Sequence, residues 1–215
     1  MSGARDAILA AARRALADRP DPPPIPRAYR RAAASADAVA RFAERVADYR
    51  AEVRVVGEPD VAEAVRGILE RIGATSVVVA PGLPEQWLPR QLQGRLSDEP
   101  PLSSAALDAV DAVLTGCAVA IAETGTIVLD GGPGQGRRAI TLIPGHHVCI
   151  VSAASIVADV PEAVTALNPR RPQTWISGPS ATSDIELNRV EGVHGPRHLY
   201  VLIATEPTRI DEPAR

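Results

Sequence analysis

The segment Ser76-Val77-Val78-Val79-Ala80 decides the fold class of this 215-residue chain. Three successive β-branched residues leave no polar side for solvent, a pattern typical of strands in parallel sheets that are covered on both faces. An amphipathic helix is predicted before it, beginning after Asp60 as N-cap and ending at Gly73. A further strand is expected at 52–56. This strand–helix–strand order predicts an α/β fold.

Strand-like runs continue toward the C-terminus in a different rhythm. Two of them flank the tight-turn signal Thr124-Gly125, which predicts a hairpin. The runs lie at residues 119–123, 126–130, 139–143, 148–152, 174–177 and 198–204. Together with the interspersed helices they predict an open mixed sheet with helices on both faces.

The N-terminal region has a different composition. Residues 4–17 carry apolar side chains at helical spacing, and the proline-rich segment 20–26 then forbids a helix and predicts an extended linker. A second helix is expected from about Ser35. We therefore divide the chain into an N-terminal helix and linker (1–34), an α/β domain (35–207) and a polar tail (208–215).

Composition narrows the class of protein. A net charge of −3 disfavours nonspecific nucleic-acid binding. No apolar run approaches the ~20 residues of a membrane span, and the first residues do not resemble a signal peptide, so we expect a cytoplasmic protein. The two isolated cysteines, Cys117 and Cys149, cannot supply the four thiolates of an iron–sulfur cluster and are predicted to be buried. We expect no cofactor in this chain.

A first candidate site follows the apolar run at 174–177. The turn Gly178-Pro179-Ser180 precedes a capping box at Ser183-Asp184-Ile185-Glu186, which predicts a helix whose free amides and positive dipole end favour an anion. The predicted ligand-binding residues here are Gly178, Pro179, Ser180, Thr182 and Asp184, with Arg197 as the fork for a carboxylate or phosphate and His194 as a catalytic candidate. The alternative is a purely structural cap, with Arg197 paired to Glu186 or Glu191.

A second candidate site is the hairpin turn at 123–126. Glu123 is predicted at a buried strand end, where a carboxylate serves as base, nucleophile or ligand anchor, and Thr124, Gly125 and Thr126 complete the turn as ligand-binding candidates. The alternative is that Glu123 caps turn amides and Gly125 supplies a positive φ.

The dipeptide His146-His147 lies on a predicted strand connection. Neighbouring residues on an extended backbone face opposite ways, so the pair does not easily hold one metal ion, and no metal site is predicted. One histidine reaching a cleft suits a donor or general acid, and His146 joins Glu123 and His194 as a catalytic candidate. The glycine-rich run 131–136 lacks the Gly-Lys-Ser/Thr of a phosphate loop and is interpreted as a mobile hairpin loop.

Three stretches taken together resemble the LUD-domain family: Ala122–Leu129, Ile143–Val151, and Ser177–Glu186 with Gly192–Arg197. The resemblance runs in order from about residue 36 to 204. It implies a fold similar to the ribose-5-phosphate isomerase, glucosamine-phosphate deaminase and CoA-transferase group. It also implies a role beside iron–sulfur partner proteins that oxidise L-lactate to pyruvate, but no assigned catalytic residue. Ala181 departs from the basic residue often found there, which weakens the anion-site hypothesis.

Three functions therefore remain open at this point. The first is the cluster-free subunit of an L-lactate-oxidising system, whose cleft binds a small carboxylate or phosphate. The second is a standalone enzyme, in which Glu123 acts as nucleophile for acyl transfer or as base in sugar-phosphate or folate-type chemistry. The third is a non-catalytic scaffold whose N-terminal helices bind the partners.

Overall fold

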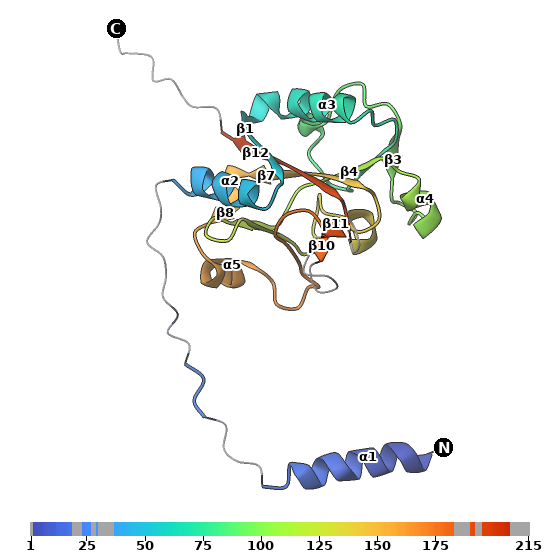
Figure 1. Ribbon diagram of the computed structural model, residues 1–215, viewed down its shortest axis with the longest axis vertical. Helices are drawn as coiled ribbons and strands as arrows, with labels where there is room; N and C mark the ends of the chain where they lie inside the picture. The colour runs from blue at the N-terminus through green and yellow to red at the C-terminus, as the bar shows by residue number, and fades with distance from the viewer. Residues whose placement is uncertain are drawn as a thin grey trace. The chain divides into compact units, whose positions relative to one another are not determined.

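The computed structural model describes residues 2–18, 23–26, 29, 37–182, 190–191 and 195–206. The chain divides into two compact units, residues 1–30 and 31–215 (Figure 1). The first unit contains the helix α1, Ser2–Ala15, where residues 4–17 were predicted to be helical. The second unit contains all of the sheets described below. No helix among the described residues has the length and apolar character that crossing a membrane requires.

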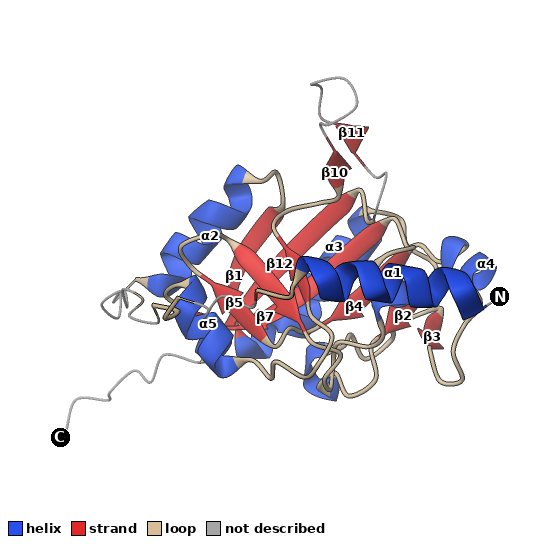
Figure 2. Cartoon of the chain, turned by 90° about the horizontal axis from the view of Figure 1, so that it is seen from below, coloured by secondary structure: helices blue, strands red, loops and turns tan. Residues whose placement is uncertain are grey.

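The large sheet of the second unit has six strands, all parallel, in the order β1-β12-β7-β4-β2-β3 (Figure 2). Their bounds are β1 Glu52–Gly57, β12 His198–Thr205, β7 His146–Ser152, β4 Ala112–Thr115, β2 Val77–Val79 and β3 Arg95–Ser97. The run that decided the fold class is thus β2, with all three valines buried. The predicted α/β class is confirmed, but the large sheet is not mixed in direction.

The antiparallel pairs belong instead to two smaller sheets. One has the order β8-β5-β6-β9, with the predicted hairpin formed by β5 and β6. Its strands are β5 Val119–Ile121, β6 Thr126–Leu129, β8 Ile156–Val157 and β9 Thr174–Ile176. The other pairs β10, Ala181–Thr182, with β11, Val190–Glu191. The sequence pattern shows strand direction only through short hairpins, so it did not reveal that these strands leave the large sheet.

Alternate residues of the large sheet feed two separate cores. Val148 and Ile150 pack with the helix α3, Val61–Arg71, on one face. Cys149 and Val151 face the other way, toward the helix α2, Ala38–Asp48, and the inner side of the β5–β6 sheet. Figure 1 shows α3 on one side of the sheet and α2 on the other. Helices on both faces explain why the central strands carry uninterrupted apolar runs.

Two further helices complete the layers. The helix α5, Val160–Ala166, packs Ala163 against the outer side of the β5–β6 hairpin, and Asp159 caps its first turn through the Glu162 amide at 2.9 Å. The helix α4, Ser104–Asp108, packs Leu107 beside the large sheet. Short 3-10 helices occupy η1 Glu58–Asp60, η2 Glu85–Trp87, η3 Arg138–Thr141 and η4 Ala153–Ser155.

Two local predictions are corrected by the structure, and a third is not tested. Residues 139–143, predicted as a strand, lie mostly in η3, because Ile140 is buried toward Val78 and Val113 and none of the described strands pairs with this segment. Asp60 precedes α3, but its side chain makes no capping hydrogen bond. The helix expected from Ser183 falls on residues 183–189, outside the described part of the chain.

The glycine-rich loop at 131–136 is anchored rather than mobile. Gln135 is buried and accepts a 2.6 Å hydrogen bond from the Asp130 amide. The Gly134 amide donates to the Pro81 carbonyl at 2.7 Å, and the Gly134 carbonyl accepts from the Gly116 amide at 2.6 Å. These bonds place the loop between the chain segments that follow β2 and β4. The glycines thus serve close backbone approach rather than flexibility.

Candidate functional site

A pocket of about 220 Å³ opens between the large sheet and the β5–β6 sheet, near the N-terminal ends of β7 and β12. His147 and Leu199 form its wall on the large sheet. The opposite wall is β9 with the loop Ser177–Ser180, and η3 contributes Arg138 and Thr141. The pocket therefore collects residues from three parts of the sequence, 138–147, 174–180 and 195–199.

His147 is a buried polar group of this pocket, with only 1% of its surface exposed. Its Nε2 lies 2.7 Å from the Thr115 hydroxyl on the neighbouring strand β4. Burial, followed by the charge of Arg138, lowers the pKa of His147 to about 4. The imidazole is consequently neutral near pH 7 and adds no charge to the pocket.

Arg138 brings a positive charge to the same pocket. Its Nη1 donates to the carbonyl oxygen of Thr141 at 3.0 Å and to the Thr141 hydroxyl at 3.1 Å. Partial burial lowers the pKa of Arg138, although a guanidinium stays protonated in proteins. Within the described ranges, no carboxylate forms an ion pair with this side chain.

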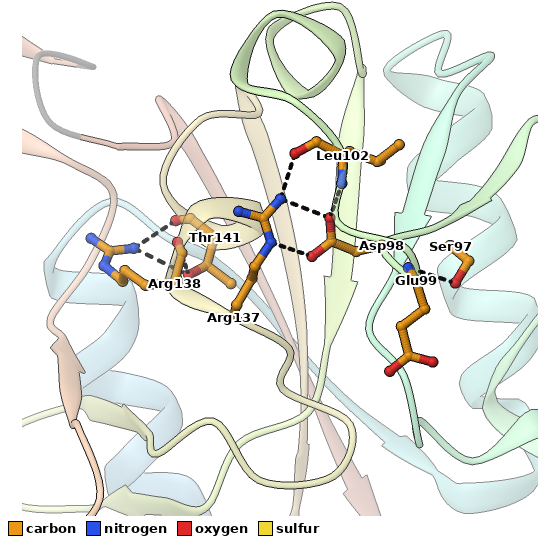
Figure 3. A network of polar contacts seen from close by, with 7 residues as sticks. All are labelled: Ser97, Asp98, Glu99, Leu102, Arg137, Arg138 and Thr141. Carbon is orange, nitrogen blue, oxygen red and sulfur yellow. Dashed lines mark hydrogen bonds and ion pairs between the residues drawn. The ribbon is translucent and has the colours of Figure 1, made fainter.

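The preceding residue, Arg137, is held quite differently. It donates to both carboxylate oxygens of Asp98, at 2.6 and 2.9 Å, and to the Leu102 carbonyl. Figure 3 shows Arg137 directed toward Asp98, while Arg138 extends the other way with Thr141. Arg137 thus forms an ion pair with Asp98, whereas Arg138 brings its positive charge to the pocket.

The two sequence-predicted sites meet through a chain of hydroxyls. Thr124 and Thr126 are 2.7 Å apart at their side-chain oxygens, and Thr126 is 2.9 Å from the Ser177 hydroxyl. Ser177, Gly178, Pro179 and Ser180 all line the pocket. The hairpin turn and the Gly-Pro-Ser loop, more than fifty positions apart in sequence, therefore form one corner of the β5–β6 sheet.

Gly125 and Gly178 have a packing role in this corner. Gly125 has a φ of +60°, and a β-carbon there would lie 2.6 Å from the carbonyl carbon of Arg45 in α2. Gly178 has a φ of +84°, and a β-carbon there would lie 2.5 Å from the Tyr49 β-carbon at the end of α2. Both glycines are needed for the close approach of α2, with a backbone conformation that favours glycine.

Glu123 and His146 lie outside this pocket's lining. Glu123 is exposed at the hairpin turn, so the predicted buried carboxylate is wrong, and its amide bonds to the Ala158 carbonyl. His146 points to the α3 face, opposite to His147, as the extended backbone predicted. It stacks on His198 at a ring distance of 4.7 Å, and its Nδ1 lies 3.3 Å from the Tyr200 hydroxyl.

The remaining predicted residues are only partly described. Arg197 is exposed, does not line the pocket, and donates its backbone amide to the Gly145 carbonyl at 3.0 Å. The Ser180 amide donates to the Pro196 carbonyl at 2.9 Å, so it does not point freely at a ligand. His194, Asp184 and the Thr182 side chain fall outside the described part of the molecule.

The two cysteines belong to the core cluster between the large sheet and α2. Cys149 is buried and Cys117 is half-buried, where burial of both was predicted. The Cys149 thiol lies 3.6 Å from the Gly116 carbonyl, and a hydrogen bond to Cys117 raises its pKa. The residues that the structure describes contain no group of three or more side chains suited to a metal ion.

Sequence reasoning missed Thr115 and Arg138 and did not single out His147 over His146. One usable signal was that His147 is the first residue of a run that is otherwise apolar through Val151, so a polar group there enters a buried layer. Arg138 follows the glycine-rich run 131–136 that was considered as a phosphate loop, but the missing Gly-Lys-Ser/Thr removed that signal.

Similarity to known proteins now places the chain in a class. Residues 39–204 match the LUD domain, and the chain belongs to the LUD-domain family. It is 47% identical over 204 residues to the protein named Lactate utilization protein C of Deinococcus radiodurans, covering 91% of this chain and 93% of that protein. The protein of the same name from Bacillus pumilus is 40% identical over 95 residues, covering 40% of this chain and 39% of the relative.

A solved structure supports the same assignment. The crystal structure of a DUF162 family protein from Deinococcus radiodurans matches with a TM-score of 0.69 and 44% sequence identity. The match covers 79% of this chain and 97% of that one. The α/β architecture described above is therefore shared with an experimentally determined fold.

Proposed function

We propose that this chain is the cluster-free component of an L-lactate utilisation system, working with iron–sulfur partner proteins that oxidise lactate to pyruvate. The observation that carries the proposal is the 47% identity to a Lactate utilization protein C along nearly the whole of both chains. Similarity of this extent supports a shared role rather than a shared fold alone. The two cysteines, which are too few for a cluster, agree with a division of labour in which the partners carry the redox centres.

The pocket supports the same proposal chemically. Lactate and pyruvate are small carboxylates, and the pocket combines an arginine that has no carboxylate partner in the described ranges with hydroxyl groups and a neutral imidazole. A relation to the ribose-5-phosphate isomerase and CoA-transferase group remains part of the proposal. The cytoplasm is the compartment that we expect for such a system.

The standalone-enzyme alternative loses its main support. It required Glu123 as nucleophile or base, and an exposed carboxylate outside the pocket has no wall against which to hold a substrate. The scaffold alternative keeps one observation in its favour. In α1 and just beyond it, Ile8 and Leu16 are 70% and 67% exposed, so this unit offers an apolar stripe to a partner.

The decisive experiment uses the complete system. This chain is co-expressed with the proteins encoded beside it, the complex is purified, and lactate-dependent dye reduction is measured with and without the chain. We expect association and a rate that depends on its presence. Full activity without the chain, or no association with iron–sulfur proteins, contradicts the proposal.

A further inference from the structure

We propose that the pocket between the two sheets binds a compact organic anion that also carries a hydrogen-bonding oxygen, with Arg138 as its counter-ion. This inference rests on the proposed function for the choice of lactate and pyruvate as probes, but its geometric argument is independent of it. It differs from the sequence prediction, which assigned the anion to Arg197 and to amides near Ser180.

Arg138 is an exposed side chain at the pocket, and its hydrogen bonds within the described part of the chain go to the neutral oxygens of Thr141. A carboxylate in the pocket would give this guanidinium the charge-assisted, forked hydrogen bonds that Thr141 cannot supply. The adjacent Arg137 shows the satisfied arrangement, with both oxygens of Asp98 bound. In the described part of the chain, no acid plays that part for Arg138.

His147 lies on the large-sheet wall of the pocket. It is buried, and its Nε2 is engaged by Thr115, which holds the ring in place. An imidazolium here would add a second positive charge beside Arg138, whereas the neutral ring adds none. A ligand with one charged end and one neutral oxygen fits this combination better than a polyanion.

The pocket is also small, with a volume of about 220 Å³, below the ~300–1,000 Å³ typical of sites for drug-sized ligands. This volume suits a compact acid of three or four carbons. Ser177 adds a hydroxyl from the wall opposite His147, and this hydroxyl is held by Thr126.

The test is calorimetric titration of the full-length chain with L-lactate, pyruvate, propionate and inorganic phosphate. We expect lactate or pyruvate to bind at least tenfold more tightly than propionate, which has the same length but no oxygen on C2, and more tightly than phosphate. Arg138→Gln should weaken that binding at least tenfold, and Arg138→Lys should recover only part of it, because a point charge lacks the guanidinium fork.

Two controls make the outcome decisive. Arg170→Gln removes an exposed arginine outside the pocket and should bind as the wild type does. Arg197→Gln tests the rival arginine. Equal affinity of wild type and Arg138→Gln overturns the inference, as does a loss confined to Arg197→Gln. Preference for phosphate overturns the ligand class.

Failure here is distinguishable from failure of the proposed function. If the purified complex oxidises lactate but the isolated chain binds none of the four anions, and Arg138→Gln leaves the KM of the complex unchanged, the pocket inference fails alone. If the pocket binds lactate while the complex works fully without this chain, the proposed function fails and the pocket stands.

Discussion

Arg137 and Arg138 are adjacent in sequence, yet they lie in opposite electrostatic environments. Arg137 is bound to Asp98, whose carboxylate is 5% exposed and also accepts from the Leu102 amide at 2.8 Å. Arg138 has neutral oxygens around it and faces a pocket. The Asp98–Arg137 ion pair stabilises the fold, whereas the Arg138 guanidinium, which has no described carboxylate partner, is available to a ligand. The hydrogen-bond partners of the two side chains, rather than their positions in the sequence, distinguish Arg137 as structural and Arg138 as a candidate functional residue.

Breaking the Asp98–Arg137 ion pair should have the largest effect on the free energy of unfolding. Asp98→Ala leaves Arg137 without its carboxylate and the Leu102 amide without its acceptor. We expect a loss of about 3 kcal/mol, the lower end for breaking a buried pair, because Arg137 itself is partly exposed. Urea unfolding measures it. A loss below about 1 kcal/mol would mean that the Asp98–Arg137 pair contributes no more than an ordinary surface ion pair.

The pH dependence of stability should identify His147. Its folded-state pKa of about 4 lies below the ordinary value of 6.5, so the unfolded chain binds the additional proton between these values. Stability is therefore full above the unfolded pKa and falls as pH drops through this window, by about 2 kcal/mol between pH 7 and 5.

The matched variant for this measurement is His147→Gln, which cannot titrate. The difference in slope between the two unfolding curves over pH 5–7 should account for that loss. Parallel curves for wild type and variant would show that the imidazole is not held neutral by burial.

Removing the support of the imidazole should have a smaller effect. Thr115→Val keeps the shape of the side chain but deletes the 2.7 Å hydrogen bond to His147. We expect a loss of about 1 kcal/mol, and an altered ring resonance of His147 in NMR spectra. An unchanged resonance would mean that Thr115 does not orient the ring.

The smallest effect on stability is expected from substitution of Arg138. Arg138→Gln removes a charge that has no described acid as partner, so the free energy of unfolding should change by less than about 0.5 kcal/mol. Thermal unfolding, compared with Arg137→Gln, checks this. If Arg138→Gln destabilises the fold as much as Arg137→Gln does, the contrast between the two arginines is wrong.

The sequence alone determined the α/β class, the β5–β6 hairpin and most strands, because these depend on local periodicity and on turn residues. The Val77–Val79 run required a sheet covered on both faces, and α3 covers one face while Leu107 of α4 and Ile140 of η3 cover the other. The opposite directions of His146 and His147 also followed from the extended backbone alone. The family, too, was readable from three short motifs, and the match over residues 39–204 confirms it.

The tertiary structure decided which polar residues share a pocket. Arg138, His147 and Ser177 line it from three different segments, and the packing of one sheet on another brings them together. The same packing exposed Glu123 and assigned Gly125 and Gly178 to contacts with α2. Burial and long-range charge arise from residues distant in sequence, so no local pattern encodes them. Local periodicity therefore specified the elements, and the layer-to-layer packing specified the candidate site.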